Sequence, residues 1–289
     1  MFKHLFTPRS SGLSLAWISV ITIVVIVVYA IIVPIVLPED QTTVNFANAY
    51  SPPSSDYWFG TDSGGHDLFV RTAQALRISL IIAVITAIFS AIIGTLIEVT
   101  AALADGFLDR LTMRFVDGMN ALPHLILVLV VVSLFKGSAT AIVLALVATH
   151  WIPIARITRA QVLTMRHSDY IQAAYLGGRG HRWVIGHHLV PGVLSQSVVG
   201  LVLLVPHAIW HESTLSFLDV GLPAHRAALG TLLRGAQGGV LLGSWWILVF
   251  PALFLVVFCL AVSHVGHSLV SVVNDYGRRE DLADASHSE

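Results

Sequence analysis

Six apolar blocks alternate with polar segments along the 289 residues of the chain. Each block is close to the roughly 20 residues that an α-helix needs to cross about 30 Å of hydrocarbon. Gly, Pro, Asp and Arg gather between the blocks, as is typical of loops. The blocks cover residues 13–34, 78–103, 119–135, 139–154, 196–217 and 245–273. This pattern predicts an all-α membrane protein with six transmembrane helices.

The first block follows Lys3 and Arg9, as the apolar region of a secretory signal would. It is longer than the roughly 7–15 residues of such a region, and no small-x-small cleavage site follows it. We therefore expect a retained first helix. The resulting organisation is an N-terminal helix with an external loop (1–74), a core transmembrane domain (75–277) and a short disordered cytoplasmic tail (278–289).

Composition supports this class of protein. Hydrophobic residues make up 55% of the chain and charged residues 11%, whereas a soluble domain carries about 25% charged residues. The net charge of −1 provides no basic surface for nucleic acid. Eleven of the 16 Lys and Arg residues fall in the segments that would be inside if the N-terminus is cytoplasmic. The positive-inside rule therefore predicts that both termini are cytoplasmic.

The longest of these inside segments, residues 155–195, is unusual for a connection between helices. Segments of this length are rarely structureless inside a compact domain. Its composition predicts two short helices at the membrane surface, joined by a bend at Gly177-Gly178 and ended by Pro191-Gly192. The segment suits docking to a cytoplasmic partner. An amphipathic helix that only lies in the interface remains the alternative.

Residues 172–191 of this segment read QAAYLGGRGHRWVIGHHLVP. This run resembles the coupling loop, with its Glu-Ala-Ala motif, of the permeases of ABC importers. Ala173, Ala174, Gly178 and Pro191 stand at the matching places, and Gln172 replaces the usual glutamate. The resemblance implies that these five residues couple the chain to a cytoplasmic ATPase subunit, into which the loop inserts.

Three further stretches resemble one branch of that superfamily, the second permease of dipeptide, oligopeptide and nickel importers. They are the GTDSGGHD run at 60–67, the spaced pattern of Asp, Met-Arg, Asp, Ala, Pro and Leu at 109–125, and ESTLSFLDVGLP at 212–223. His66 stands where arginine is usual, and Asp219 where glycine is usual. The resemblance covers residues 58–223 and implies the fold of a type I ABC-importer permease.

The resemblance also implies the partners. These are a homologous permease that shares the pore, two cytoplasmic ATPase subunits or domains, an external substrate-binding protein facing 60–67 and 219–230, and the bacterial inner membrane. No Gly-x-x-x-x-Gly-Lys-Ser/Thr motif occurs in the sequence. We therefore expect no catalytic residue and no cofactor in this chain, with ATP and Mg²⁺ held by the ATPase partners. The expected cargo is di- or oligopeptides.

Histidine suggests an alternative cargo of nickel, another metal chelate or haem. His207 and His211 are four residues apart and so share a helix face, with Glu212 beside them. The metalloprotease pattern H-E-x-x-H is absent, and we assign no metal site. These three residues are instead our candidate substrate path, which further histidines could extend: His124, His150, His264 and His267. Hydrogen bonding between helices is the alternative role for all of them.

Glu98, late in the second block, has two interpretations. It could be a proton or cation site, or it could lie near the cytoplasmic interface and pair with Arg110 or Arg114, which we favour. An ion-coupled secondary transporter that uses Glu98, Glu212 and the histidines is the less favoured alternative to an ATP-driven importer. An intramembrane hydrolase is disfavoured because no nucleophile–base pair lies at helical spacing.

Overall fold

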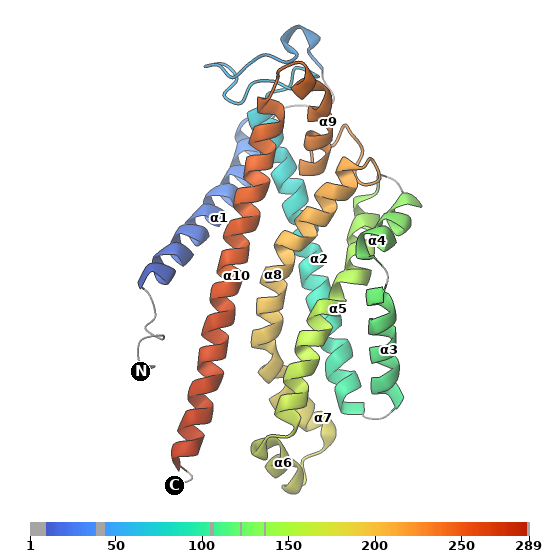
Figure 1. Cartoon of the computed structure of the whole chain (residues 1–289), viewed down its shortest axis with the longest axis vertical. Helices are drawn as coiled ribbons and strands as arrows, with labels where there is room; N and C mark the ends of the chain where they lie inside the picture. Colours follow the sequence, from blue (N-terminus) through green and yellow to red (C-terminus); the bar gives the residue numbers. More distant parts are fainter. Residues whose placement is uncertain (1–9, 39–43, 105–106, 122, 136, 288–289) are drawn as a thin grey trace, which may run out of the picture.

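The structure, a computed structural model, describes residues 10–38, 44–104, 107–121, 123–135 and 137–287. Five long helices form its body (Figure 1): α1 (Ser10–Val36), α2 (Leu68–Ala104), α5 (Ala139–Arg166), α8 (Val190–Phe217) and α10 (Trp246–His287). Among the described residues, the only β pairing is an isolated bridge between Thr61 and Asp67. The all-α prediction is confirmed.

The helices run in alternating directions between two ends of the molecule (Figure 1). One end carries the short 3₁₀ helix η1 (Phe46–Asn48) and α9 (Leu229–Leu241). The other end carries α6 (Asp169–Leu176), α7 (His181–Val184) and the C-terminus. Five helical runs are long and apolar enough to span a membrane, and a bent pair, α3 with α4, completes six.

The third span is not the straight helix predicted for 119–135. It consists of α3 (Phe107–Ala121) and α4 (His124–Ser133), whose axes differ by 82°. Pro123 stands at the N-cap of α4. Proline has no N–H to give to a preceding turn and disfavours helical backbone in the residue before it. The break between α3 and α4 therefore has a local cause, Pro123, which mean hydropathy does not reveal.

Several helices are longer than their apolar blocks. α2 begins ten residues before the predicted start, and α5 continues past 154 to Arg166. Hydropathy marks only the part of a helix that suits hydrocarbon, while its polar ends continue into the interface. The tail was expected to be disordered from residue 278, but α10 continues to His287. The Glu, Ala, Leu and Arg residues of that stretch have high helix propensity.

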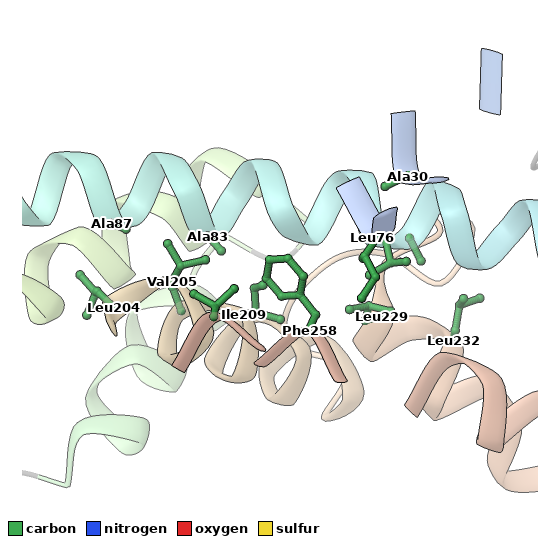
Figure 2. Packing of buried hydrophobic residues seen from close by; sticks show 14 of the residues in the cluster. Ala30, Leu76, Ala83, Ala87, Leu204, Val205, Ile209, Leu229, Leu232 and Phe258 are labelled. Carbon is green, nitrogen blue, oxygen red and sulfur yellow. The ribbon is translucent and has the colours of Figure 1, made fainter. Parts of the chain in front are cut away.

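The main core lies where α1, α2, α8, α9 and α10 meet (Figure 2). Small residues of α2, such as Ala83 and Ala87, face larger side chains of α8, including Val205 and Ile209. Small side chains at helix contacts allow close backbone approach, which favours association in a membrane. α2 and α5 approach even more closely, since a Cβ atom on Gly94 would lie 2.6 Å from the carbonyl oxygen of Trp151. These close contacts hold the long helices in fixed positions relative to one another.

Candidate functional sites

The segment predicted to dock a partner forms the two short helices α6 and α7, joined by a glycine bend. Gly178 has a φ of +79°, a left-handed conformation that glycine adopts at no steric cost. Asp169 lies in the first turn of α6, where its negative charge interacts favourably with the helix dipole and stabilises the helix. The glycine bend predicted from the sequence is therefore confirmed.

The predicted end of the second short helix at Pro191-Gly192 is wrong. α7 passes through a π-helical turn, η2 (Ile185–Leu189), directly into α8, giving one helical run, His181–Phe217. Pro191 lies in the first turn of α8, where the missing N–H costs little. The wider π turn precedes this proline and accommodates the change in hydrogen-bond register. A push on α7 would therefore be transmitted straight into a membrane span.

One face of the α6–α7 segment is anchored and the other is free in this chain. A buried apolar cluster joins it to the ends of α2, α5 and α8: Val99, Val162, Ile171, Val184, Leu189 and Val193. On the opposite side, Gln172 and Ala173 are exposed, Ala174 is half-buried, and Leu176 is 90% exposed. Exposed apolar side chains beside polar ones are typical of protein–protein contact surfaces.

At the other end of the molecule, Asp62 organises the segment that resembles the family's GTD motif. Its carboxylate accepts hydrogen bonds from the backbone N–H groups of Gly64 and His66, at 2.8 and 3.0 Å. It also pairs with Arg71 at 3.3 Å. The ring of His66, which stands where the family has arginine, lies 3.0 Å from the Asp62 carboxylate. This network fixes the shape of the 60–67 segment.

The two segments expected to face a binding protein, 60–67 and 219–230, line one cavity of about 610 Å³ together with α9. Asp219, at the edge of the second segment, has a φ of +65° and forms an ion pair with Arg234. Asp67 caps α2 by accepting a hydrogen bond from the Phe69 N–H at 2.8 Å. Burial raises the pKa of Asp67, although its backbone hydrogen bonds act in the opposite direction. This end is therefore concave and internally braced, and its cavity is lined by both apolar and charged residues.

Glu98 pairs with an arginine on a neighbouring helix. It is 1% exposed, and its carboxylate lies 3.6 Å from the guanidinium of Arg159 on α5. α2 and α5 pack side by side, which brings Arg159 to the carboxylate. The expected type of partner was right, and Arg159 is an arginine that the sequence did not single out. The ion pair between packed helices accounts for the burial of this carboxylate.

Glu212 does not lie with the two histidines. It is fully buried, and its carboxylate accepts hydrogen bonds from Ser79 of α2 at 2.6 Å and Ser216 of α8 at 2.8 Å. The Ser79 hydroxyl also accepts the N–H of Leu229, at the start of α9, at 3.2 Å. The carboxylate thus connects three helices. The sequence neighbour of His211 therefore has serine hydroxyls as its hydrogen-bond partners.

The structure brings four histidines from three helices together. The Nε2 atoms of His207 and His211 are 3.2 Å apart. The ring of His124, the first residue of α4, lies 4.8 Å from that of His211, and the ring of His150 on α5 lies 5.0 Å from it. Sequence reasoning named all four but joined only the pair on α8, because only that pair has a local spacing.

His264 and His267 lie on α10, outside this group of ring contacts. The Nδ1 of His267 donates to the backbone carbonyl of Ser263 in its own helix at 2.7 Å. These two residues therefore do not extend the path that the sequence suggested. We call the group of His124, His150, His207 and His211 the histidine cluster.

Comparison with known proteins agrees with this architecture. Residues 92–274 match the family described as "Binding-protein-dependent transport system inner membrane component". The chain is 35% identical over 255 residues to the oligopeptide transport system permease protein OppC of Bacillus subtilis, covering 88% of this chain and 83% of that protein. It is 34% identical over 252 residues to the dipeptide transport system permease protein DppC of B. subtilis, covering 87% and 79%. It is also 34% identical over 253 residues to OppC of Escherichia coli K12, covering 87% and 83%.

Proposed function

The chain belongs to the family of inner membrane components of binding-protein-dependent transport systems, and we propose that it forms half of the pore of an ATP-driven peptide importer. It is a multi-pass membrane permease with the fold of type I importers. Its relatives are oligopeptide and dipeptide transport permeases, so the proposed cargo is short peptides. A homologous permease would complete the pore.

The α6–α7 segment carries the proposal of coupling. Its exposed side, which includes Gln172, Ala173 and Leu176, would insert into an ATPase subunit. Its anchored side packs on three spans, and α7 continues into α8 through η2. Closure of the two ATPase subunits on ATP and Mg²⁺ would therefore tilt α8 and change which side of the pore is open. The chain itself would need neither cofactor nor catalytic residue.

The direction of transport follows from the same arrangement. With the α6–α7 segment in the cytoplasm, both termini would also be cytoplasmic. The 60–67 and 219–230 segments would then be external and receive the binding protein at the cavity they line. The Arg and Lys distribution supports this orientation.

A second cargo, nickel or another metal chelate or haem, is favoured by the histidine cluster and is developed in the next subsection. An ion-coupled secondary transporter has less support. Glu98 pairs with Arg159, and Glu212 is held by two serine hydroxyls. Both carboxylates therefore have partners that account for their burial, which gives that mechanism less support than coupling to an ATPase.

Cysteine cross-linking tests the coupling proposal. A cysteine at Leu176, which is 90% exposed, should form a disulfide with a cysteine in the ATPase subunit of the assembled complex. A cysteine at Leu241 is the control, because Leu241 is 89% exposed at the opposite end of the molecule. The proposal fails if position 241 cross-links to the ATPase and position 176 does not.

A further inference from the structure

The histidine cluster differs from an ordinary packing contact in how its nitrogen atoms are used. The Nδ1 of His150 lies 2.9 Å from the backbone carbonyl of Leu146. A carbonyl oxygen can only accept, so this nitrogen carries the hydrogen and the Nε2 has a lone pair. That Nε2 is buried and has no hydrogen-bond partner among the described residues. Histidine ligands of metals are commonly held in this way, with the second ring nitrogen bonded to a carbonyl.

The other rings complete the arrangement. One nitrogen from each of His124, His150 and His211 can be chosen so that all three lie within 4.8 Å of one another. The Nε2 atoms of His207 and His211 are 3.2 Å apart. Four ligands at 2.0–2.1 Å in a tetrahedral site are separated by about 3.3 Å. The His207–His211 edge already has this spacing. The chosen nitrogen atoms of His124, His150 and His211 lie within 4.8 Å of one another, and side-chain shifts would have to bring the four ligands together around an ion.

The cluster also lies where a transported group could reach it. His150 and His211 are buried inside the spans Ala139–Arg166 and His181–Phe217, and His124 follows the break between α3 and α4. His207 is exposed on the surface of this single chain. Polar groups at membrane depth face a cavity or a partner and not lipid. The open side of the cluster therefore points to the pore or to the homologous permease that borders it.

We infer that His124, His150, His207 and His211 form a binding site for a divalent transition-metal ion. Imidazole nitrogen suits nickel, copper and zinc, whereas hard ions such as magnesium require oxygen ligands. The four rings are neutral when they bind, so the ion would keep its charge of two at membrane depth. A double positive charge at membrane depth is energetically costly, and a metal ion bound to an anionic short peptide avoids this cost because the peptide neutralises the charge. The inference rests on the proposed function, since it makes metal–peptide chelates part of the importer's cargo.

Metal binding to the purified importer tests the inference. The full chain is isolated with its partner subunits through a tag that contains no histidine, and Ni²⁺ alone is titrated by calorimetry. We expect one ion for each copy of the chain. His150→Asn keeps an amide N–H that can donate to the backbone carbonyl of Leu146 but removes the Nε2 ligand. His211→Asn removes a second ligand. Each should weaken binding by at least about 100-fold, since changes one shell further out already cost 10–100-fold.

The matched control is His267→Ala, which removes an exposed histidine bonded within its own helix and should leave Ni²⁺ affinity unchanged. If either buried variant fails to assemble, His207→Asn replaces it, because the exposed ring is easily substituted. The inference is overturned if wild type binds no Ni²⁺, or if the cluster variants bind as tightly as the control. Peptide uptake by proteoliposomes is measured in parallel. If the wild-type importer takes up peptide but binds no Ni²⁺, only the inference is overturned. If it takes up no peptide, the proposed function is overturned.

Discussion

Replacing Glu212 provides a quantitative test of its structural role. Glu212→Ala removes the acceptor for the hydroxyl groups of Ser79 and Ser216, which lie 2.6 and 2.8 Å from the carboxylate. Hydrogen bonds between helices in membranes are worth about 0.6 kcal/mol on average and about 1.7 at most. The bond to Ser216, which lies within the same helix, contributes roughly 1 kcal/mol. Together the losses come to about 2–3 kcal/mol, before any cost of the cavity that the shorter side chain leaves.

A loss of this size should be visible in thermal denaturation. For chains of this size, 1 kcal/mol corresponds to about 2–4 °C, so Glu212→Ala should lower the apparent melting temperature by roughly 4–12 °C. Ser79→Ala should also lower the melting temperature, because it removes one donor to the carboxylate and the acceptor for the Leu229 N–H. Ser213→Ala is the control, since its hydroxyl lies 3.5 Å from the carboxylate, at the limit of a hydrogen bond. It should change the melting temperature by less than about 1 °C.

The assay compares melting temperature with uptake of a labelled peptide by the reconstituted importer. If Glu212 connects α2, α8 and α9, uptake should fall only as far as the amount of assembled complex falls. A Glu212→Ala complex with unchanged melting temperature and no uptake would refute this account. It would instead make the carboxylate part of the transport chemistry, as an ion-coupled mechanism requires.

Three further predictions follow from single features. Gly178→Leu should leave the complex assembled but reduce peptide uptake per ATP hydrolysed, because a left-handed φ costs a non-glycine residue about 1–2 kcal/mol; unchanged coupling would remove the bend from the mechanism. In a chain whose native cysteine is replaced, a cysteine at Ser55 should react with an impermeant reagent from outside and one at Arg179 only from inside; the reverse pattern would invert the topology. Arg159→Met should destabilise the chain by about 3–5 kcal/mol by leaving the buried carboxylate of Glu98 without its arginine, and adding Glu98→Gln should recover part of that loss; two strictly additive losses in melting temperature would contradict the pairing.

The sequence predicted the number and order of the spans because hydrophobic length is a local property. It missed the 82° break between α3 and α4, since the residues on both sides of Pro123 are as apolar as those of a straight span. It placed the bend at Gly177-Gly178 correctly because glycine pairs have few other local roles. It did not predict that α7 and α8 are continuous, because Pro191 indicates a stop unless the neighbouring turn widens.

The sites depend more on contacts between distant residues. The partner of Glu98 could not be chosen from sequence, because Arg110 and Arg114 are the nearest arginines along the chain and only the packing of α2 against α5 brings Arg159 to the carboxylate. Glu212 was grouped with His211 although adjacent residues of a helix point about 100° apart. The histidine cluster needs the break before His124 and the crossing of three helices, and no local pattern encodes either.

ATP-driven import of peptides through this chain is the central claim, and one measurement tests it directly. The measurement is uptake of a labelled short peptide into proteoliposomes that contain this permease, its homologous partner and the ATPase subunits. With the binding protein outside and ATP inside, at the α6–α7 end, we expect uptake that stops when ATP or the binding protein is omitted. Uptake by the chain alone, driven by an ion gradient and independent of ATP, would contradict the account.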